Sequence, residues 1–187
     1  MAKTKNLVIV YTGLGQGKTS AALGLTLRAL REGRQVTMIQ FIKSQHQSGE
    51  MKLQKILPKL KIKCFGQGFV FKQQETVQNK WCKNLVFEKH RLTAQNGLEY
   101  TKELINSERA QFIILDEIFV AYNLKLITLV DLINLIKVFR QSIHTALVLT
   151  GRGCPKAIYN LADQVTELKN IKHPFQKGII AQKGIDF

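Results

Sequence analysis

The feature that most constrains the fold of this chain is a glycine-rich segment, Gly13-Leu14-Gly15-Gln16-Gly17-Lys18-Thr19. It follows an apolar run at residues 7–11 and precedes residues 18–31, where small and apolar side chains recur at about helical spacing. Glycines let backbone N–H groups converge on phosphate oxygens, and the N-terminus of a helix adds favourable partial charge. The ammonium group of Lys18 can neutralise phosphate charge, and the hydroxyl group of Thr19 can bind Mg²⁺. The segment therefore predicts a strand, a phosphate loop and a helix in succession.

The segment departs from the usual phosphate-loop pattern at one position. That pattern places a glycine six residues before the lysine, where this chain has Thr12. The order of strand, loop and helix compensates for this departure. We therefore interpret the segment as a phosphate loop and not as an ordinary glycine turn.

Apolar runs alternate with helical patterns along the rest of the chain. Strands are predicted at residues 7–11, 36–42, 61–65, 112–115, 145–150 and 165–168, the last of them in the core. Helices are predicted at residues 18–31, from about 77 to 105, after a Thr128 cap, and from Pro155 to Ala162. The long helix is expected to carry Trp81, Leu85, Leu92 and Leu98 on its inner side. Several strands are apolar without polar alternation, which predicts one α/β domain (residues 1–187) with a mainly parallel sheet and helices on both faces.

An acidic pair, Asp116-Glu117, directly follows the strand predicted at residues 112–115. In a parallel sheet the carboxyl end of this strand lies at the same edge as the phosphate loop. Carboxylates there can bind Mg²⁺ directly or through water. Neighbouring residues of a strand point in opposite directions, so spacing alone does not decide which of the two contacts the metal.

Two weaker motifs follow other strands. In Thr150-Gly151-Arg152-Gly153, the arginine between glycines can approach a polyphosphate closely, although an ordinary turn with an exposed arginine explains the pattern equally well. In residues 66–71, the glycines beside Phe69 and Phe71 suggest a mobile loop with apolar side chains. These two phenylalanines pack either into the core or against a planar ligand.

Composition narrows the classes of function. A net charge of +15 fits attraction to polyanions, or simply a solvated lysine-rich surface, because the basic residues are spread along the chain. Three widely spaced cysteines and four scattered histidines indicate free thiols in a reducing cytosol and argue against a histidine-based metal site. We expect a cytoplasmic protein, because the chain has neither a run of 18 apolar residues nor a signal peptide at its start.

Taken together, these motifs resemble the P-loop corrinoid adenosyltransferases. The resemblance also rests on Gln40-Phe41-Ile42-Lys43, on Gly49-Glu50, and on pieces between Leu161 and Phe187 that include Lys183-Gly184-Ile185-Asp186-Phe187. It runs in order from about Val8 to Phe187. The phosphate loop alone would be unspecific, but its combination with Thr150–Cys154 and the C-terminal stretch is highly specific.

The resemblance implies a RecA-like fold of the P-loop NTPase class, usually a homodimer. It implies that the 5′-deoxyadenosyl group of ATP is transferred to cob(I)alamin or to a precursor, with triphosphate as the other product. A flavoprotein reductant is compatible with this reading, and neither nucleic acid nor a membrane is expected as a partner. The nucleophile would be Co(I) of the corrinoid substrate, so no Ser/His/Asp or Cys/His constellation is needed in the protein.

The resemblance also assigns roles to residues. Lys18 and Arg152 would stabilise charge on the leaving triphosphate, and Phe69 and Phe71 would help to hold the corrinoid without a lower axial ligand. Mg²⁺ would be held by Thr19 and the Asp116-Glu117 pair, with Glu117 favoured. The residues expected to bind ATP are Gly13, Leu14, Gly15, Gln16, Gly17, Lys18, Thr19 and Ser20.

This chain departs from the family pattern in three places. A basic residue is common in the family where this chain has Gln16, and a tryptophan is common where it has Phe71. Only about six residues precede the first strand, which leaves open what covers the corrinoid. Two other functions compete with the transfer of an adenosyl group. They are a phosphotransferase acting on a small substrate and a RecA-like ATPase moving on nucleic acid, although no recognition motif for nucleic acid is evident.

Overall fold

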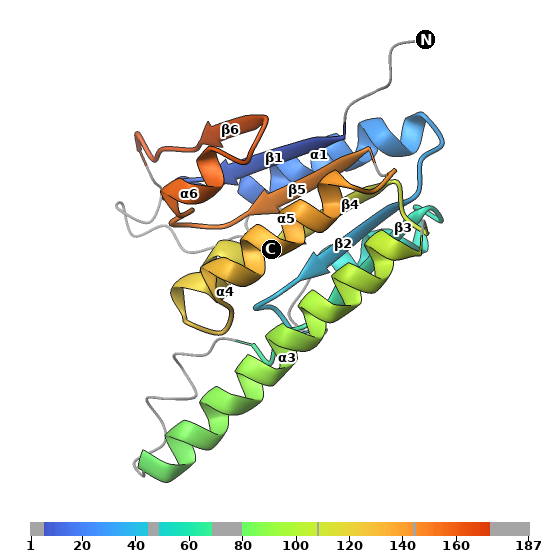
Figure 1. Ribbon diagram of the computed structural model, residues 1–187. Coiled ribbons are helices and arrows are strands. Elements are labelled where there is room, and N and C mark those ends of the chain that lie inside the picture. Colours follow the sequence, from blue (N-terminus) through green and yellow to red (C-terminus); the bar gives the residue numbers. More distant parts are fainter. Residues whose placement is uncertain (1–5, 45–48, 69–79, 108, 144, 173–187) are drawn as a thin grey trace.

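The computed structural model describes residues 6–44, 49–68, 80–107, 109–143 and 145–172, with the backbone alone at residues 80–84 (Figure 1). The elements are β1 (Leu7–Thr12), α1 (Lys18–Arg31), β2 (Val36–Gln40), the 3-10 helix η1 (Gly49–Lys55), β3 (Leu60–Cys64), α3 (Lys80–Asn106), β4 (Phe112–Asp116), α4 (Ile118–Asn123), α5 (Leu129–Arg140), β5 (Ala146–Thr150), α6 (Lys156–Tyr159) and β6 (Gln164–Glu167). The described part of the chain contains no helix that is long and apolar enough to span a bilayer.

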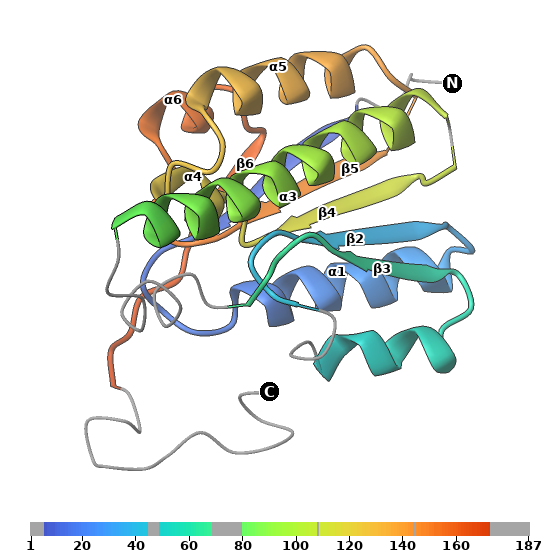
Figure 2. The same ribbon diagram turned by 90° about the horizontal axis from the view of Figure 1, so that it is seen from below.

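The strands form one parallel sheet in the order β3-β2-β4-β5-β1-β6. Figure 2 shows helices on both sides of it: α1 and η1 on one face, and α3, α4 and α5 on the other. The α/β class and the mainly parallel sheet are therefore confirmed. Because all ladders are parallel, the carboxyl ends of the strands meet at one edge, where β1 leads into the phosphate loop and β4 ends at Asp116.

The two apolar layers follow from strands whose residues are buried on both faces. In β4, Ile113 and Leu115 pack into the layer beneath α3, α4 and α5, whereas Ile114 packs into the layer beneath α1. Every residue of β4 is buried, which explains its continuous apolar run. The central strands are thus packed from both sides up to the edge at which they end.

Local sequence signals set the starts of two helices, α5 and α6. The hydroxyl group of Thr128 accepts a hydrogen bond from the backbone N–H of Asp131, and the carboxylate of Asp131 accepts one from the backbone N–H of Thr128. This capping box confirms the predicted start of α5. Pro155 precedes α6 as predicted, but α6 ends at Tyr159, earlier than expected. The helix α4 and the 3-10 helix η1 were not predicted, because both are short.

Two expectations about burial are wrong. The last strand, β6, has a single neighbour, β1, and only Val165 is half-buried in it, so it is an edge strand and not a core strand. On α3, Leu98 is buried, but Leu85 and Leu92 are 64% and 63% exposed. Leu92 and Leu98 are six residues apart, which at 3.6 residues per turn puts them on different sides of the helix. Trp81 is among the residues for which only the backbone is described.

The cysteine expectation holds where it can be examined. Cys64 and Cys154 are free and half-buried. Burial raises the pKa of the Cys154 thiol to about 12, so this group stays protonated at neutral pH. The side chain of Cys82 lies outside the described part.

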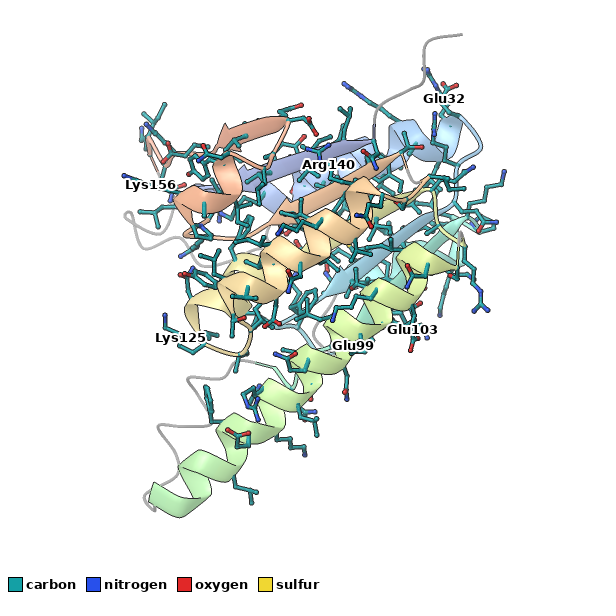
Figure 3. All side chains as sticks on the ribbon, in the orientation of Figure 1. Glu32, Glu99, Glu103, Lys125, Arg140 and Lys156 are labelled. Carbon is teal, nitrogen blue, oxygen red and sulfur yellow. The ribbon has the colours of Figure 1, made fainter. Side chains whose placement is uncertain are left out.

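An ion pair on the side of the sheet that carries α5 joins three parts of the fold. Arg140, near the end of α5 (Figure 3), donates to the backbone carbonyls of Asn6 and Leu161 and lies 2.7 Å from the carboxylate of Asp163. The same carboxylate accepts a hydrogen bond from the backbone N–H of Val8. The side chains of Arg140 and Asp163 are 26% and 18% exposed. The pair therefore ties the end of α5 to β1 and to the approach to β6.

Arg140→Ala is expected to lower the free energy of unfolding by about 2 kcal/mol, because it removes charge-assisted hydrogen bonds that solvent screens only in part. Urea unfolding followed by circular dichroism measures this change. Glu32→Gln is the control, since the Arg31–Glu32 pair has side chains that are 83% and 59% exposed. That control should change stability by less than about 0.5 kcal/mol. Equal effects of the two substitutions would contradict the assignment.

Candidate functional site

The phosphate loop lies between β1 and α1 at the carboxyl edge of the sheet. Gly13 and Gly17 have φ angles of 100° and 98°, which favour glycine over any other residue. Gly17 occupies the N-cap position of α1 without a side-chain cap, and the first turn holds no acidic residue. The N-cap residue therefore has no side chain that could cap the N–H groups of this turn, and these groups suit an anion.

Thr12 occupies the position of the usual first glycine of the loop, and its φ is not positive. It is the last residue of β1, and its side chain is buried. Its hydroxyl group accepts a hydrogen bond from the backbone N–H of Cys154, and its carbonyl accepts one from the backbone N–H of Leu168. At this position the threonine joins β1 to the segments that follow β5 and β6.

The ammonium group of Lys18 is directed into the loop. It donates to the carbonyls of Gly13 and Gly15 at 2.9 and 2.6 Å, and the residue is only 6% exposed. Burial lowers the pKa of Lys18, and the nearby charge of Glu117 acts in the opposite direction. A phosphate at the start of α1 would thus meet a cation that already lies in the loop.

Asp116 is fully buried and accepts hydrogen bonds from three elements. Its Oδ1 accepts from the hydroxyl groups of Thr19 (2.9 Å) and Thr150 (2.7 Å), and its Oδ2 accepts from the side chain of Gln40 (3.1 Å). The ammonium group of Lys43 is 3.8 Å from Oδ2. The structure therefore brings the predicted metal residues Thr19 and Asp116 into direct contact.

Glu117 provides the unsatisfied oxygen of the site. Its Oε2 is buried without a hydrogen-bond partner. Burial and then repulsion from Asp116 raise the pKa of Glu117, against the opposing charges of Lys18, Lys43 and Arg152. Its backbone has a φ of 59°, a left-handed conformation that is uncommon outside glycine and often found at functional sites. An orphaned carboxylate oxygen of this kind fits a ligand for Mg²⁺.

The residues present fit a magnesium ion that is shared with phosphate groups. Within the described ranges, no group of three His, Cys, Asp or Glu side chains is arranged to hold a metal. Magnesium in nucleotide sites usually takes one or two carboxylates, and phosphate oxygens and water complete its coordination. The set of Thr19, Asp116 and Glu117 matches that pattern, so the metal would bind together with a polyphosphate.

Lys43 and Glu50 extend this cluster, although the sequence analysis gave them no role. The ammonium group of Lys43 lies 2.9 Å from the carboxylate of Glu50 on η1. Burial lowers the pKa of Lys43, but the carboxylates of Asp116 and Glu50 together raise it above its ordinary value. Gln40 likewise carried the resemblance but was given no role in the site. The available signal was a polar residue at the end of an otherwise apolar strand.

Arg152 lies in the turn after β5, as predicted. Gly151 and Gly153 on either side have φ angles of 139° and 70°. Asn123 at the end of α4 holds the turn by donating to the carbonyls of Arg152 (2.8 Å) and Gly153 (3.2 Å). The side chain of Arg152 is exposed, and its charge lowers the pKa of both Lys18 and Glu117. It therefore lies within electrostatic range of the phosphate loop and the acidic pair.

The glycine-aromatic segment leaves β3 at the same edge of the sheet. A Cβ atom on Gly66 would lie 2.2 Å from the carbonyl group of Ile42, so only glycine fits there. Gly68 has a φ of 91°, and Gln67 donates to the hydroxyl group of Thr93 on α3. Phe69 and Phe71 lie outside the described residues. The segment that leads to them is thus anchored beside the candidate site.

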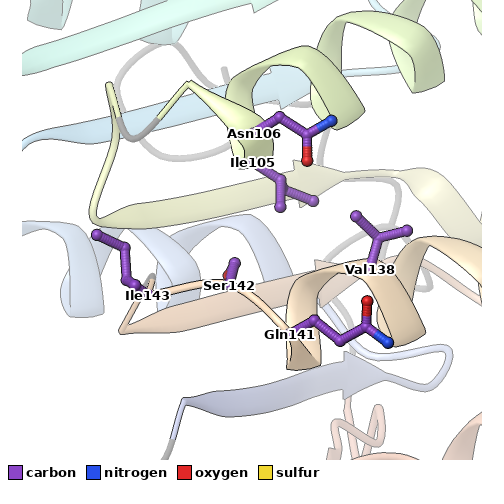
Figure 4. Close-up of a pocket in the computed structure, with 6 residues that line it drawn as sticks. All are labelled: Ile105, Asn106, Val138, Gln141, Ser142 and Ile143. Carbon is purple, nitrogen blue, oxygen red and sulfur yellow. The ribbon is translucent and has the colours of Figure 1, made fainter.

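A cavity of about 320 Å³ lies at the opposite edge of the sheet (Figure 4). It is lined by Ile105, Asn106, Val138, Gln141, Ser142 and Ile143. These residues precede β4 and β5, whereas the phosphate loop and the acidic pair follow strands. None of the six side chains is titratable, so this cavity is not the candidate site.

Comparisons with known proteins agree with this geometry. A sequence model of the family described as "ATP:corrinoid adenosyltransferase BtuR/CobO/CobP" matches residues 4–187. A corrinoid adenosyltransferase of Sinorhizobium sp. is 33% identical over 98% of this chain and 81% of its own length. The corrinoid adenosyltransferase CobA of Salmonella typhimurium is 32% identical over 98% of this chain and 86% of its own length. A corrinoid adenosyltransferase of Pseudomonas aeruginosa is 29% identical, over 98% and 84%.

Thr150 gives a stability prediction for the site. Its hydroxyl group donates to Asp116 and accepts from the backbone N–H of Glu117. Thr150→Val should lower the free energy of unfolding by about 1–3 kcal/mol, because Asp116 loses one of its three hydrogen bonds and the backbone N–H of Glu117 loses its acceptor. Urea unfolding tests this. Thr101→Val is the matched control, since Thr101 is also fully buried but donates only to the carbonyl of Gly97 within α3. A control effect as large as that of Thr150→Val would contradict the prediction.

Proposed function

This chain belongs to the ATP:corrinoid adenosyltransferase family, and we propose that it transfers the 5′-deoxyadenosyl group of ATP to the cobalt of a reduced corrinoid. Co(I) of the corrinoid substrate attacks the C5′ atom of ATP, and a Co–C bond forms as the C5′–O bond breaks. The electron pair of the broken bond leaves with triphosphate, and cobalt is formally oxidised to Co(III). Atoms and electrons balance without a protein nucleophile.

The observation that carries the proposal is the composition of the carboxyl edge of the sheet. The helix α1 begins after a glycine N-cap, which has no capping side chain. The buried ammonium group of Lys18, in its first turn, lies within electrostatic range of Glu117, whose Oε2 is buried without a hydrogen-bond partner. These groups suit a polyphosphate with a divalent ion. In the proposed reaction the triphosphate is the leaving group, so stabilising its charge lowers the barrier.

The positions of the residues support the following proposed roles. Residues 13–20 bind the triphosphate, with Lys18 and Arg152 supplying positive charge. Thr19, Asp116 and Glu117 would hold Mg²⁺, which when bound supplies further positive charge to the phosphates. The protein then acts mainly by holding the ribose of ATP against the corrinoid in the orientation that the reaction needs.

We propose Phe69 and Phe71 as the corrinoid-binding pair. Support comes from the anchored start of their segment at Gly66 and Gly68, which leaves the sheet at the edge that carries the phosphate loop. Apolar side chains that displace a lower axial ligand would leave cobalt four-coordinate and easier to reduce. We further propose that each chain forms a single domain of residues 1–187 and that two chains form a homodimer in the cytoplasm. A flavoprotein is the proposed electron donor.

The products of the reaction test the proposed chemistry. With ATP, Mg²⁺ and chemically reduced cobalamin, phosphorus NMR should show intact triphosphate, formed in equal amount with adenosylcobalamin measured by its absorbance. A reaction without reduced cobalamin is the control and should leave ATP unchanged. ADP as the stoichiometric product would reject the adenosyl transfer and support a phosphotransferase.

Lys18→Ala and Glu117→Ala should each lower turnover by about 10²–10³, the usual effect of removing one preorganised electrostatic group. Initial rates of adenosylcobalamin formation measure this. Lys156→Ala is the charge-matched control, because Lys156 is exposed at the start of α6 (Figure 3), and it takes part in none of the hydrogen bonds and ion pairs of the site described above. Circular dichroism should be the same for all variants. A folded Lys18→Ala protein with normal turnover would remove the loop lysine from the mechanism.

A further inference from the structure

The segment that follows β6 lies directly against the phosphate loop. We call residues 168–170 the brace. The backbone N–H of Leu168 donates to the carbonyl of Thr12 (2.8 Å), and the carbonyl of Leu168 accepts from the backbone N–H of Gly15 (2.7 Å). The side chain of Asn170 accepts from the backbone N–H of Gln16 (3.2 Å) and donates to the carbonyl of Leu14 (3.3 Å). Four hydrogen bonds thus connect a segment about 150 residues away in sequence to the loop.

The brace explains why residue 15 is a glycine, which its backbone conformation does not explain. Gly15 has no positive φ, unlike Gly13 and Gly17. A Cβ atom on Gly15 would nevertheless lie 2.7 Å from the carbonyl carbon and oxygen of Leu168, closer than real Cβ atoms come to such atoms. Gly15 is therefore required by the close approach of the brace. This close packing of two backbone segments indicates that the contact between Gly15 and Leu168 is a specific feature of the fold.

The brace also decides which N–H groups face a phosphate. The N–H groups of Gly15 and Gln16 already donate to the brace. At the start of α1 the N-cap residue, Gly17, has no side chain to cap the N–H groups, and the ammonium group of Lys18 donates to the carbonyl of Gly15. Binding of the triphosphate therefore depends on the N–H groups at the start of α1. The outer turn of the loop, residues 14–16, must be held in place so that these groups are accessible.

Apolar packing contributes little to holding that outer turn. Leu14 at its tip is 69% exposed, so its side chain is mostly in solvent. The carboxamide of Asn170 bonds to both Leu14 and Gln16 and thereby bridges the two sides of the tip. A single side chain with a donor and an acceptor is suited to this task, because it fixes two backbone groups at once.

We infer that Asn170 is a positioning residue for triphosphate binding, acting through the outer turn of the phosphate loop. The inference deepens the proposed function, because it rests on the loop binding the triphosphate of ATP. Asn170 touches neither the substrate nor the metal in this account. Its effect is on the free energy of ordering the loop, so it acts on affinity for triphosphate and not on the chemical step.

The test is calorimetric binding of Mg²⁺ with inorganic triphosphate, and of Mg²⁺ with ATP, to wild type and to Asn170→Ala. Both dissociation constants should rise about tenfold, which corresponds to the loss of one to two ordinary hydrogen bonds. In the adenosylation assay the KM for ATP should rise by a similar factor, with kcat within about twofold of wild type. Asn170→Ser is a second variant in case the alanine protein is poorly folded, and it should give the same direction of change.

Gln164→Ala is the matched control, because Gln164 is an exposed amide on β6 that bonds to Thr166 and not to the loop. It should leave both dissociation constants and the melting temperature unchanged. Unchanged triphosphate binding in Asn170→Ala would overturn the inference. Tighter binding would overturn it too, since the brace would then compete with phosphate for the loop N–H groups. Triphosphate binding is measured without corrinoid, so a wild type that binds it but makes no adenosylcobalamin would reject the proposed reaction and leave this test intact.

Discussion

The buried carboxylate of Asp116 is the contact on which the arrangement of the site depends. A charge without solvent exposure is costly unless several donors satisfy it. Here the donors come from β2 through Gln40, from α1 through Thr19 and from β5 through Thr150. The hydrogen bonds that compensate for the loss of hydration therefore also fix the distance between α1 and the sheet. In the proposed function, the same contacts would position the ligands of Mg²⁺.

Close backbone approaches fix the rest of the carboxyl edge. The absence of a side chain at Gly15 allows the close approach of the brace, and at Gly66 it allows the close approach of Ile42 and Lys43, which follow β2. A Cβ atom on Gly151 would come within 3.0 Å of Phe119, and Gly151 also has a φ of 139°. The glycines of this edge thus share one physical role, which is to let loops from separate strands converge where a larger residue would hold them apart.

The charges at this edge suit a reaction whose nucleophile is supplied by the substrate. Lys18, Lys43 and Arg152 face Asp116, Glu117 and Glu50, so opposite charges are already balanced within the protein. In the proposed reaction, the triphosphate of ATP and magnesium would bind among these charges, and the reaction would need no base or nucleophile from the protein. In the proposed reaction such a site would act by orientation and by electrostatic stabilisation.

The sequence by itself determined the class of fold, the phosphate loop and the acidic pair, because these depend on local patterns: apolar strands, glycines before a lysine, and carboxylates after a strand. Those patterns could not locate Gln40, Lys43 or Asn170, whose partners lie far away in the chain. They also misassigned Leu85 and Leu92 on α3 and the depth of β6, since burial depends on what packs against an element. Only the tertiary structure decided that Gly15 faces Leu168 and that Glu117 keeps an unsatisfied oxygen, because both facts arise where separate loops meet at one edge of a parallel sheet.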